Sequence, residues 1–289
     1  MMKTFLSLLR PEQWIKNLFL FAPLIFSRRL FDTGSFVDVL VGFILFSAAS
    51  SSAYIFNDIR DVASDLQHPV KRFRPVASGK ISLSLAMSLS AVLGMASVII
   101  SYSVNHVFGL IVLGYIVLNI AYSVFFKHMV ILDVMVIAAC FLLRVMAGAS
   151  IIDVYPSSWL IVCTIFLALF LGFGKRRHEI LLLSGNANMH RKVLEYYGNP
   201  NFLDQMIGIV TACTVVSYML YTVSEETVRF FGTRQLIWTV PFVLYGIFRY
   251  LYLVYIKEEG GDPAGILLRD KPLLVNILLW SVSCIIIVY

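Results

Sequence analysis

The sequence predicts an all-helical, polytopic membrane protein, a bundle of nine transmembrane helices that forms a single domain over residues 1–289. Three observations lead to this fold class. Hydrophobic residues make up 59% of the chain and charged residues only 14%, whereas about a quarter of the residues in a soluble domain are charged. The mean hydropathy is +0.84. The apolar excess also extends over the whole chain, which favours one integral membrane domain over two soluble ones.

The individual spans follow from the thickness of a bilayer. A hydrocarbon core of about 30 Å requires roughly 20 mostly apolar residues per helix. The stretches that reach or approach this length are 14–26, 37–56, 83–103, 108–126, 130–152, 159–173, 203–223, 236–256 and 272–289. The first and sixth stretches are short for a full crossing, and interfacial extensions through 10–13 and 155–158 would complete them.

Positive charge is unequally divided between the two predicted faces of this bundle. Eighteen of the 23 Lys and Arg residues fall on the side of the N-terminus, four fall on the other side, and Arg144 lies within the fifth span. Loops rich in Lys and Arg remain in the cytoplasm. We therefore expect a cytoplasmic N-terminus. The long polar connections 58–82, 174–202 and 257–271 lie on the same face, so the functional site is expected there.

Several classes of site are not supported by the sequence. The four cysteines lie in apolar runs without disulfide or zinc spacing, as is typical of buried thiols. Neither a phosphate-binding loop motif nor a dinucleotide-binding glycine motif is present. The net charge of +6 indicates phosphates of small molecules and lipid headgroups as partners, and nucleic acid is not expected for a chain buried in a bilayer.

The most informative segment is acidic and follows the second span. Asp58, Asp61 and Asp65 are spaced i, i+3 and i+7, so on a continuous helix they lie within an arc of about 60°, with Asn57 adjacent. Three carboxylates on one stripe repel one another unless a cation lies among them. Oxygen ligands suit Mg²⁺, which usually binds one or two carboxylates together with substrate phosphates. The alternative is a solvated acidic end of a helix.

A basic loop follows directly. Lys71, Arg72 and Arg74 place three positive charges within four positions, and arginine side chains bind phosphate with two parallel hydrogen bonds. Pro69, Pro75 and nearby Gly79 favour a defined turn. A membrane anchor on the cytoplasmic side would explain the basic residues alone, but such an anchor does not require acidic residues beside it.

These two segments together resemble a known family signature. The pattern Asn-Asp-x-x-Asp-x-x-x-Asp, followed by His-Pro-x-Lys-x-x-Arg-Pro-x-x-x-Gly, is similar to the first motif of the UbiA superfamily of intramembrane prenyltransferases. The resemblance begins at Arg10-Pro11-Glu12-Gln13-Trp14 and covers nearly the whole chain. It implies nine spans around a central cavity that opens to the cytoplasm and laterally to lipid, with Mg²⁺ bridging aspartates to a diphosphate.

One departure from the family pattern indicates a subclass. Typical members carry a second aspartate-rich motif after the sixth span, where this chain has Lys175-Arg176-Arg177-His178-Glu179, with Arg191-Lys192 further on. Fewer metal ligands and more phosphate ligands imply more phosphate groups on the substrates. This resembles the polyprenyl-phosphate phosphoribosyltransferases of the bacterial inner membrane. The resemblance implies transfer of 5-phosphoribose from phosphoribosyl pyrophosphate to a polyprenyl phosphate such as decaprenyl phosphate, with release of pyrophosphate, for cell-envelope synthesis.

The predicted site combines these motifs with further matching positions. Its catalytic residues are Asp58, Asp61, Lys127 and Asp133. Its Mg²⁺ ligands are Asp58, Asp61, Asp65 and Asn57. Its substrate-binding residues are Asn57, Lys71, Arg72, Arg74, Tyr122, Arg144, Lys175, Arg176 and Glu179.

Some of these roles have open alternatives. Asp133 would hold ribose hydroxyls or orient Lys127. Arg144 and Asp133 are expected to face the bundle interior, because a charge facing lipid is costly, and for Arg144 a structural ion pair is an equal alternative to substrate binding. Glu179 has the alternative of a local pair with Lys175 or Arg176.

Two other functions remain to be separated from this one. A UbiA-type prenyltransferase would move a prenyl group from a prenyl diphosphate to an aromatic acceptor, but the missing second aspartate motif argues against it. A transporter of phosphorylated metabolites should show paired broken helices or repeat symmetry, which the sequence lacks. Whether the chain forms a homo-oligomer is left open.

Overall fold

A computed structural model describes residues 2–67, 70–183, 197 and 200–289, and the regular structure in these ranges is helical. The chain divides into two compact units. Among the described residues, unit 1 comprises 2–156, and unit 2 comprises 157–183, 197 and 200–289. Each unit is described by itself below.

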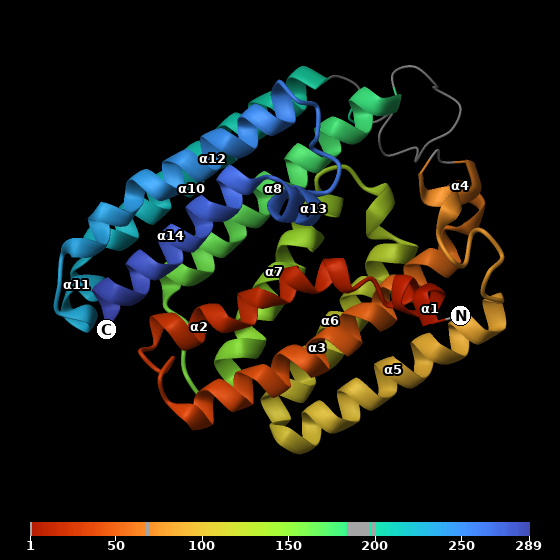
Figure 1. The fold of residues 1–289 in the computed structure, drawn as a ribbon, viewed down its shortest axis with the longest axis horizontal. Helices are drawn as coiled ribbons and strands as arrows, with labels where there is room; N and C mark the ends of the chain where they lie inside the picture. Colours follow the sequence, from red (N-terminus) through yellow and green to blue (C-terminus); the bar gives the residue numbers. More distant parts are fainter. Residues whose placement is uncertain (1, 68–69, 184–196, 198–199) are drawn as a thin grey trace. The chain divides into compact units, whose positions relative to one another are not determined.

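Eight helices in the described ranges are long and apolar enough to cross a membrane, which confirms an all-helical multi-pass protein. Unit 1 contains α3 (Thr33–Arg60), α5 (Leu83–Val104), α6 (His106–Val124) and α7 (Leu132–Ile151) (Figure 1). Unit 2 contains α8 (Ser158–Leu183), α10 (Pro200–Val223), η4 (Gln235–Thr239) continued by α12 (Val240–Tyr255), and α14 (Lys271–Val288). They correspond to the second to ninth predicted spans.

The first predicted span, 14–26, is built differently. It consists of a 3₁₀ helix, η1 (Pro11–Leu20), followed by a short α-helix, α2 (Phe21–Phe26), and it is preceded by α1 (Met2–Leu9). A 3₁₀ helix rises about 2.0 Å per residue instead of 1.5 Å, so these two segments together are about 29 Å long. That length approaches the thickness of the hydrocarbon core. A ninth crossing stays a prediction. The extended geometry of the 3₁₀ helix would allow these few residues to span the membrane.

The repeat of η1 matches the repeat of the helix beside it. Trp14 Nε1 donates to Ser51 Oγ at 3.0 Å, and Asn17 Nδ2 donates to Ser47 Oγ at 3.0 Å. Three residues of η1 thus correspond to four residues of α3, running in the opposite direction. Three residues of a 3₁₀ helix and four of an α-helix both advance about 6 Å. The two helices therefore remain in register.

The next residue on this face of η1, Leu20, lies against α7. A Cβ atom added at Gly148 would lie 2.0 Å from the carbonyl oxygen of Leu20. A glycine is therefore required for the close approach of α7 and η1, as in other membrane helices that pack through small residues.

The central helix of unit 1 is α3, which packs against α5, α6, α7 and η1. Serines make part of this packing. Ser52 Oγ donates to the carbonyl oxygen of Ser90 at 2.7 Å, and Ser90 Oγ donates to that of Ser52 at 2.9 Å. Short side chains allow close helix contact and satisfy each other's hydrogen bonds away from water. The N-terminus of α3 is capped by Asp32, which accepts the backbone N–H of Ser35 at 3.1 Å.

Unit 2 is held together by polar contacts between its helices. The hydroxyl groups of Tyr218 and Thr239 lie 2.6 Å apart, and Trp280 Nε1 donates to Tyr218 at 2.9 Å. At the other end of α12, Arg249 donates two hydrogen bonds to Asp270, which also caps α14. These hydrogen bonds hold the pKa of the Asp270 carboxyl below its usual value. Two short helices complete the unit, namely α11 (Glu225–Phe231) and α13 (Pro263–Arg269). The second lies within the predicted polar connection 257–271.

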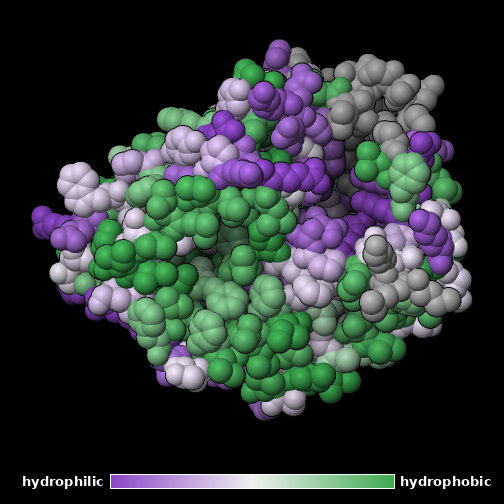
Figure 2. All heavy atoms as spheres, viewed as in Figure 1, coloured by the Kyte–Doolittle hydropathy of each residue, from purple (hydrophilic) through white to green (hydrophobic). Residues whose placement is uncertain are grey.

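The outer faces of the long helices are apolar. On α3 the exposed side chains include Phe36, Val37 and Ile44, the last with 61% of its surface exposed, and Figure 2 shows apolar side chains covering this part of the helix. Exposed large apolar side chains also lie on α5, α6, α7, α10, α12 and α14, as is expected where lipid, and not water, surrounds a protein.

Replacing Gly148 by alanine should destabilise the protein. The added Cβ overlaps the backbone of Leu20, and overpacking of this kind costs about 1–3 kcal/mol. Thermal unfolding in detergent should show a lower midpoint for Gly148→Ala than for Gly114→Ala, because a Cβ at Gly114 meets nothing within 4 Å. Equal midpoints for the two variants would contradict the close packing of α7 on η1.

Candidate active site

The acidic segment continues as an almost unbroken helix. Helix α3 ends at Arg60, and α4 (Val62–Gln67) begins two residues later. The backbone hydrogen bonds between these helices keep the helical i to i−4 pattern, from Asp61 N to Asn57 O at 2.9 Å and from Asp65 N to Asp61 O at 2.8 Å. Asp58, Asp61 and Asp65 are all buried, with exposed fractions of 1%, 7% and 3%. Three neighbouring carboxylates are therefore removed from water, which requires nearby positive charge.

Two arginines supply positive charge to Asp58 and Asp65. Arg74, in the turn after η2 (Lys71–Phe73), lies between them, with its Nη1 atom 3.1 Å from Asp58 Oδ1 and 2.6 Å from Asp65 Oδ2. Arg10 Nη2 donates to the same Asp58 oxygen at 2.5 Å. One carboxylate oxygen of Asp58 thus accepts hydrogen bonds from two guanidinium groups.

Asp61 has a different partner. Lys127, from η3 (Phe126–His128), is 5% exposed, and its Nζ atom lies 2.5 Å from Asp61 Oδ1. Asn57 Nδ2 donates to Asp61 Oδ2 at 3.0 Å, and Ser123 Oγ donates to Asn57 Oδ1 at 3.1 Å. This chain of contacts joins the C-terminal ends of α3 and α6.

One carboxylate oxygen of the cluster takes no part in these contacts. Asp58 Oδ2 is buried and has no hydrogen-bond partner among the described residues. A buried acceptor without a partner is costly, and a cation would satisfy it. No three acidic, His or Cys side chains in the described ranges converge on a point that could hold a metal. The residues therefore fit a Mg²⁺ ion bound by one or two carboxylates and completed by substrate phosphates, and they do not fit a site built from protein ligands alone.

The predicted set of four ligands is accordingly not assembled as one group. Arg74 donates a hydrogen bond to Asp65, whereas Lys127 and Asn57 donate to Asp61. The sequence argument required a cation among the three carboxylates, and in this structure basic side chains of the protein provide it.

Arg10 was not among the predicted site residues. It lies between α1 and η1 with φ 53° and ψ 59°, a left-handed conformation that costs a non-glycine residue free energy and is concentrated at functional sites. Its guanidinium group also lies 5.8 Å from the centre of the Tyr54 ring. Arg10 is 48 positions from Asp58, so no local spacing could pair them. The only sequence signal was its place at the start of the Arg-Pro-Glu-Gln-Trp segment.

Arg144 lies within the core of unit 1. It is 2% exposed, and it donates to Asn17 Oδ1 at 2.8 Å, the Cys140 carbonyl at 2.7 Å and the Tyr115 hydroxyl at 2.9 Å. The rings of Phe46, Tyr115 and Phe141 lie 4.8–5.4 Å from its guanidinium carbon. No carboxylate pairs with it in the described part of the chain, and its role stays a prediction. Neutral acceptors and aromatic faces solvate this cation instead.

The remaining predicted residues of unit 1 lie in different surroundings. Asp133 is fully buried in the first turn of α7, where its Oδ1 atom accepts the N–H of Val134 at 2.8 Å. Tyr122 is half-buried and packs on the core of unit 1. Lys71 is half-buried, whereas Arg72 is exposed and lies over the ring of Phe73. The roles assigned to these four residues stay predictions.

The predicted second basic segment is helical. The sixth span was expected to end at 173, but α8 continues to Leu183, so 174–179 form a helix and not a loop. Lys, Arg, Glu and Leu favour helices. Arg176, which is 1% exposed, pairs with Glu179, as the local alternative for Glu179 anticipated. Lys175 is half-buried. These three residues belong to unit 2, and their part in the site stays a prediction. His68, Arg191 and Lys192 lie outside the described residues.

Comparisons with known proteins agree with this architecture. The model of the UbiA prenyltransferase family matches residues 18–264. The decaprenyl-phosphate phosphoribosyltransferase of Corynebacterium glutamicum is 35% identical over 97% of this chain and 85% of that protein, and the enzyme of the same name from Mycolicibacterium smegmatis is 32% identical over 94% and 88%. A UbiA homologue from Archaeoglobus fulgidus, bound to GPP and Mg²⁺, has a TM-score of 0.76 with 19% identity over 99% of both chains.

The pairing of Lys127 with Asp61 generates a stability prediction. Lys127→Met removes the cation beside a buried carboxylate, which typically costs about 3–5 kcal/mol. Adding Asp61→Asn to this variant should recover much of the loss, because the second change removes the buried negative charge. Thermal unfolding of the two single variants and the double variant gives the coupling energy. Strictly additive effects would show that the two side chains do not interact.

Proposed function

Because this chain belongs to the UbiA prenyltransferase family, we propose that it acts as a polyprenyl-phosphate phosphoribosyltransferase within that family. It transfers 5-phosphoribose from phosphoribosyl pyrophosphate to a polyprenyl phosphate such as decaprenyl phosphate, and pyrophosphate leaves. The observation that carries this proposal is the buried cluster in which Asp58, Asp61 and Asp65 meet Arg10, Arg74 and Lys127. The names of relatives that are 32–35% identical over nearly the whole chain support the choice of substrates.

The reaction exchanges one bond at C1 of the ribose. An oxygen of the lipid phosphate attacks C1, the bond from C1 to the pyrophosphate oxygen breaks, and attack from the opposite face inverts the anomeric centre. A phosphate monoester is already an anion, so the lipid acceptor needs no strong general base. The chief requirement is stabilisation of the negative charge on the departing pyrophosphate.

Asp58 and Asp61 are the residues that would hold Mg²⁺, with Asn57 or Asp65 in support, and the bound metal would supply positive charge to the leaving group. Arg10, Arg74 and Lys127 contact carboxylates in this structure. With a metal on those carboxylates, the three cations would be available to phosphate oxygens. Lys71, Arg72, Lys175 and Arg176 would bind the remaining phosphates, Tyr122 and Glu179 would line the substrates, and Asp133 would hold ribose hydroxyls or orient Lys127.

The same proposal covers the organisation of the chain. The family match at 18–264 runs through both units, which supports a single functional domain over residues 1–289. The distribution of Lys and Arg supports a cytoplasmic N-terminus and a cytoplasmic site. The bacterial relatives support placement in a bacterial inner membrane.

The assignment can be tested with two pairs of substrates. Purified protein in detergent should form polyprenylphosphoryl-5-phosphoribose and pyrophosphate from labelled phosphoribosyl pyrophosphate, polyprenyl phosphate and Mg²⁺. It should not transfer a prenyl group from a prenyl diphosphate to 4-hydroxybenzoate. Asp58→Asn should reduce turnover at least a hundredfold while the protein stays folded, whereas Asp38→Asn on the exposed start of the same helix should have no effect. Product from the second pair alone would overturn the proposal.

The ion pairs also predict how the metal binds. Mg²⁺ alone would separate the buried Lys127 and the half-buried Arg10 and Arg74 from their carboxylate partners, which is unfavourable. Isothermal titration calorimetry should therefore detect at least tenfold tighter Mg²⁺ binding when inorganic pyrophosphate is present, after correction for the complex that the two form in solution. The reciprocal enhancement must be equal. The coupling should disappear in Asp58→Asn. Tight Mg²⁺ binding without pyrophosphate would contradict the exchange of partners.

A further inference from the structure

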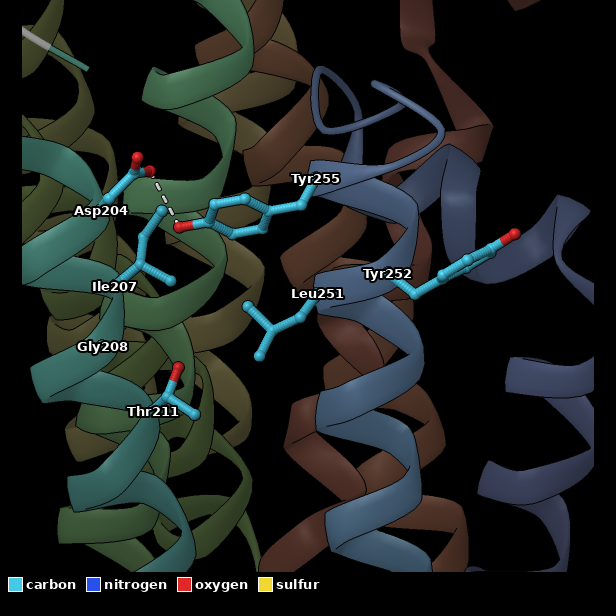
Figure 3. Close-up of a pocket in the computed structure, with 7 residues that line it drawn as sticks. All are labelled: Asp204, Ile207, Gly208, Thr211, Leu251, Tyr252 and Tyr255. Carbon is cyan, nitrogen blue, oxygen red and sulfur yellow. Dashed lines mark hydrogen bonds between the residues drawn. The ribbon is translucent and has the colours of Figure 1, made fainter. Parts of the chain in front are cut away.

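Unit 2 contains a slot that the proposed mechanism does not use. A pocket of about 350 Å³ lies between α10 and α12 (Figure 3). Ile207 and Leu251 provide apolar walls from the two helices, and Gly208 leaves the wall of α10 without a side chain. The other lining residues are Asp204, Thr211, Tyr252 and Tyr255. This lining of apolar groups with a few polar ones is typical of ligand sites, although the volume is near the lower limit for them.

The slot is held open by polar contacts at both of its ends. At one end Tyr255 donates from its hydroxyl group to Asp204 Oδ1 at 2.8 Å, and Arg177 Nε of α8 donates to the same oxygen at 2.6 Å. At the other end Tyr218 of α10 contacts Thr239 at the start of α12. Because both helices are fixed above and below the slot, it is a preformed feature of the unit.

Two polar atoms near the slot are buried without a hydrogen-bond partner in the described ranges, namely Arg177 Nη1 and Thr211 Oγ1. The Arg177 guanidinium group is fixed in place, since it also lies 3.9 Å from the centre of the Tyr255 ring. An unpaired buried donor is costly. An anionic oxygen at this end of the slot would give Arg177 the missing acceptor.

The position of the slot selects a lipid as its occupant. Both helices are apolar enough to cross a membrane, so a slot between them lies at membrane depth. The polar end lies where α10 begins and α12 ends, and tyrosines at the ends of membrane helices mark the interface with water. A ligand that suits the slot would therefore have an anionic headgroup at the polar end and a hydrocarbon chain between the apolar walls.

We propose that this slot binds the acceptor polyprenyl phosphate. Its phosphate would lie at the end lined by Tyr255, beside the Arg177 guanidinium group, and its first isoprene units would lie between α10 and α12 over Gly208. One slot accommodates one chain, which favours a polyprenyl phosphate over a two-chain phospholipid. Arg177 directly follows Lys175 and Arg176, so the lipid phosphate would lie beside the predicted phosphate-binding residues of α8. The identity of the lipid rests on the proposed function.

A steric variant tests the slot without disturbing the polar contacts. A Cβ at Gly208 meets nothing within 4 Å, so Gly208→Leu should fold, and its side chain should fill the slot. Gly114→Leu is the matched control, because Gly114 also lies within a long helix with nothing within 4 Å of an added Cβ. Thermal unfolding should show that both variants are folded.

Binding is measured first, by native mass spectrometry of detergent-solubilised protein with polyprenyl phosphate or with phosphatidylglycerol. Gly208→Leu should bind polyprenyl phosphate at least tenfold more weakly than wild type and Gly114→Leu, with phosphatidylglycerol adducts unchanged. In the transfer assay its KM for polyprenyl phosphate should rise by a similar factor, while the KM for phosphoribosyl pyrophosphate stays the same.

The outcomes separate the two proposals. Unchanged binding and KM for polyprenyl phosphate in Gly208→Leu would overturn the slot and leave the transferase activity intact. Selective loss of phosphatidylglycerol would show a phospholipid site and would overturn the choice of occupant. Loss of polyprenyl phosphate binding in a protein whose wild type forms no phosphoribosyl product would support the slot and overturn the proposed function.

Discussion

Burial of the carboxylates of Asp58, Asp61 and Asp65 is the constraint on which the organisation of unit 1 depends. Buried carboxylates are stable only when cations lie beside them, and these cations come from segments far apart in the sequence. Arg10 precedes η1, Arg74 follows η2 and Lys127 belongs to η3. Each ion pair therefore fixes a connecting segment onto the end of α3. The irregular backbone at these points, including the left-handed conformation at Arg10, is a consequence of bringing the charges together.

The same pairing gives the cluster its chemical character. Every cation that contacts an aspartate of this cluster is also a potential phosphate ligand, and one oxygen of Asp58 has no donor among the residues that the structure describes. The proposed binding of a metal and phosphates would require these side chains to change partners. Arg144 differs, because its charge is stabilised by aromatic rings and neutral acceptors and it serves as a part of the core.

Much of the fold followed from the sequence because apolar length and helical periodicity are local properties. The long helices and the spacing of the aspartates fall in this class. The 3₁₀ conformation of η1 was not predictable, because it depends on the register of Trp14 and Asn17 with serines of α3. The extension of α8 through its charged residues was missed, because hydropathy ends a span where charge begins, although the helix need not end there. Arg10 was missed because its partner is distant along the chain.

The matched repeats of η1 and α3 also restrict how this segment can change during evolution. Each hydrogen bond between them depends on three residues of one helix advancing as far as four of the other. Substitutions that keep the side chains of Trp14 and Asn17 would be tolerated along η1, but inserting or deleting one residue would rotate every later side chain by about 120°. Leu20 would then lose its contact with Gly148, and Asn17 would lose its hydrogen bond to Ser47. Among homologous proteins, this segment should therefore vary in composition while its length remains constant.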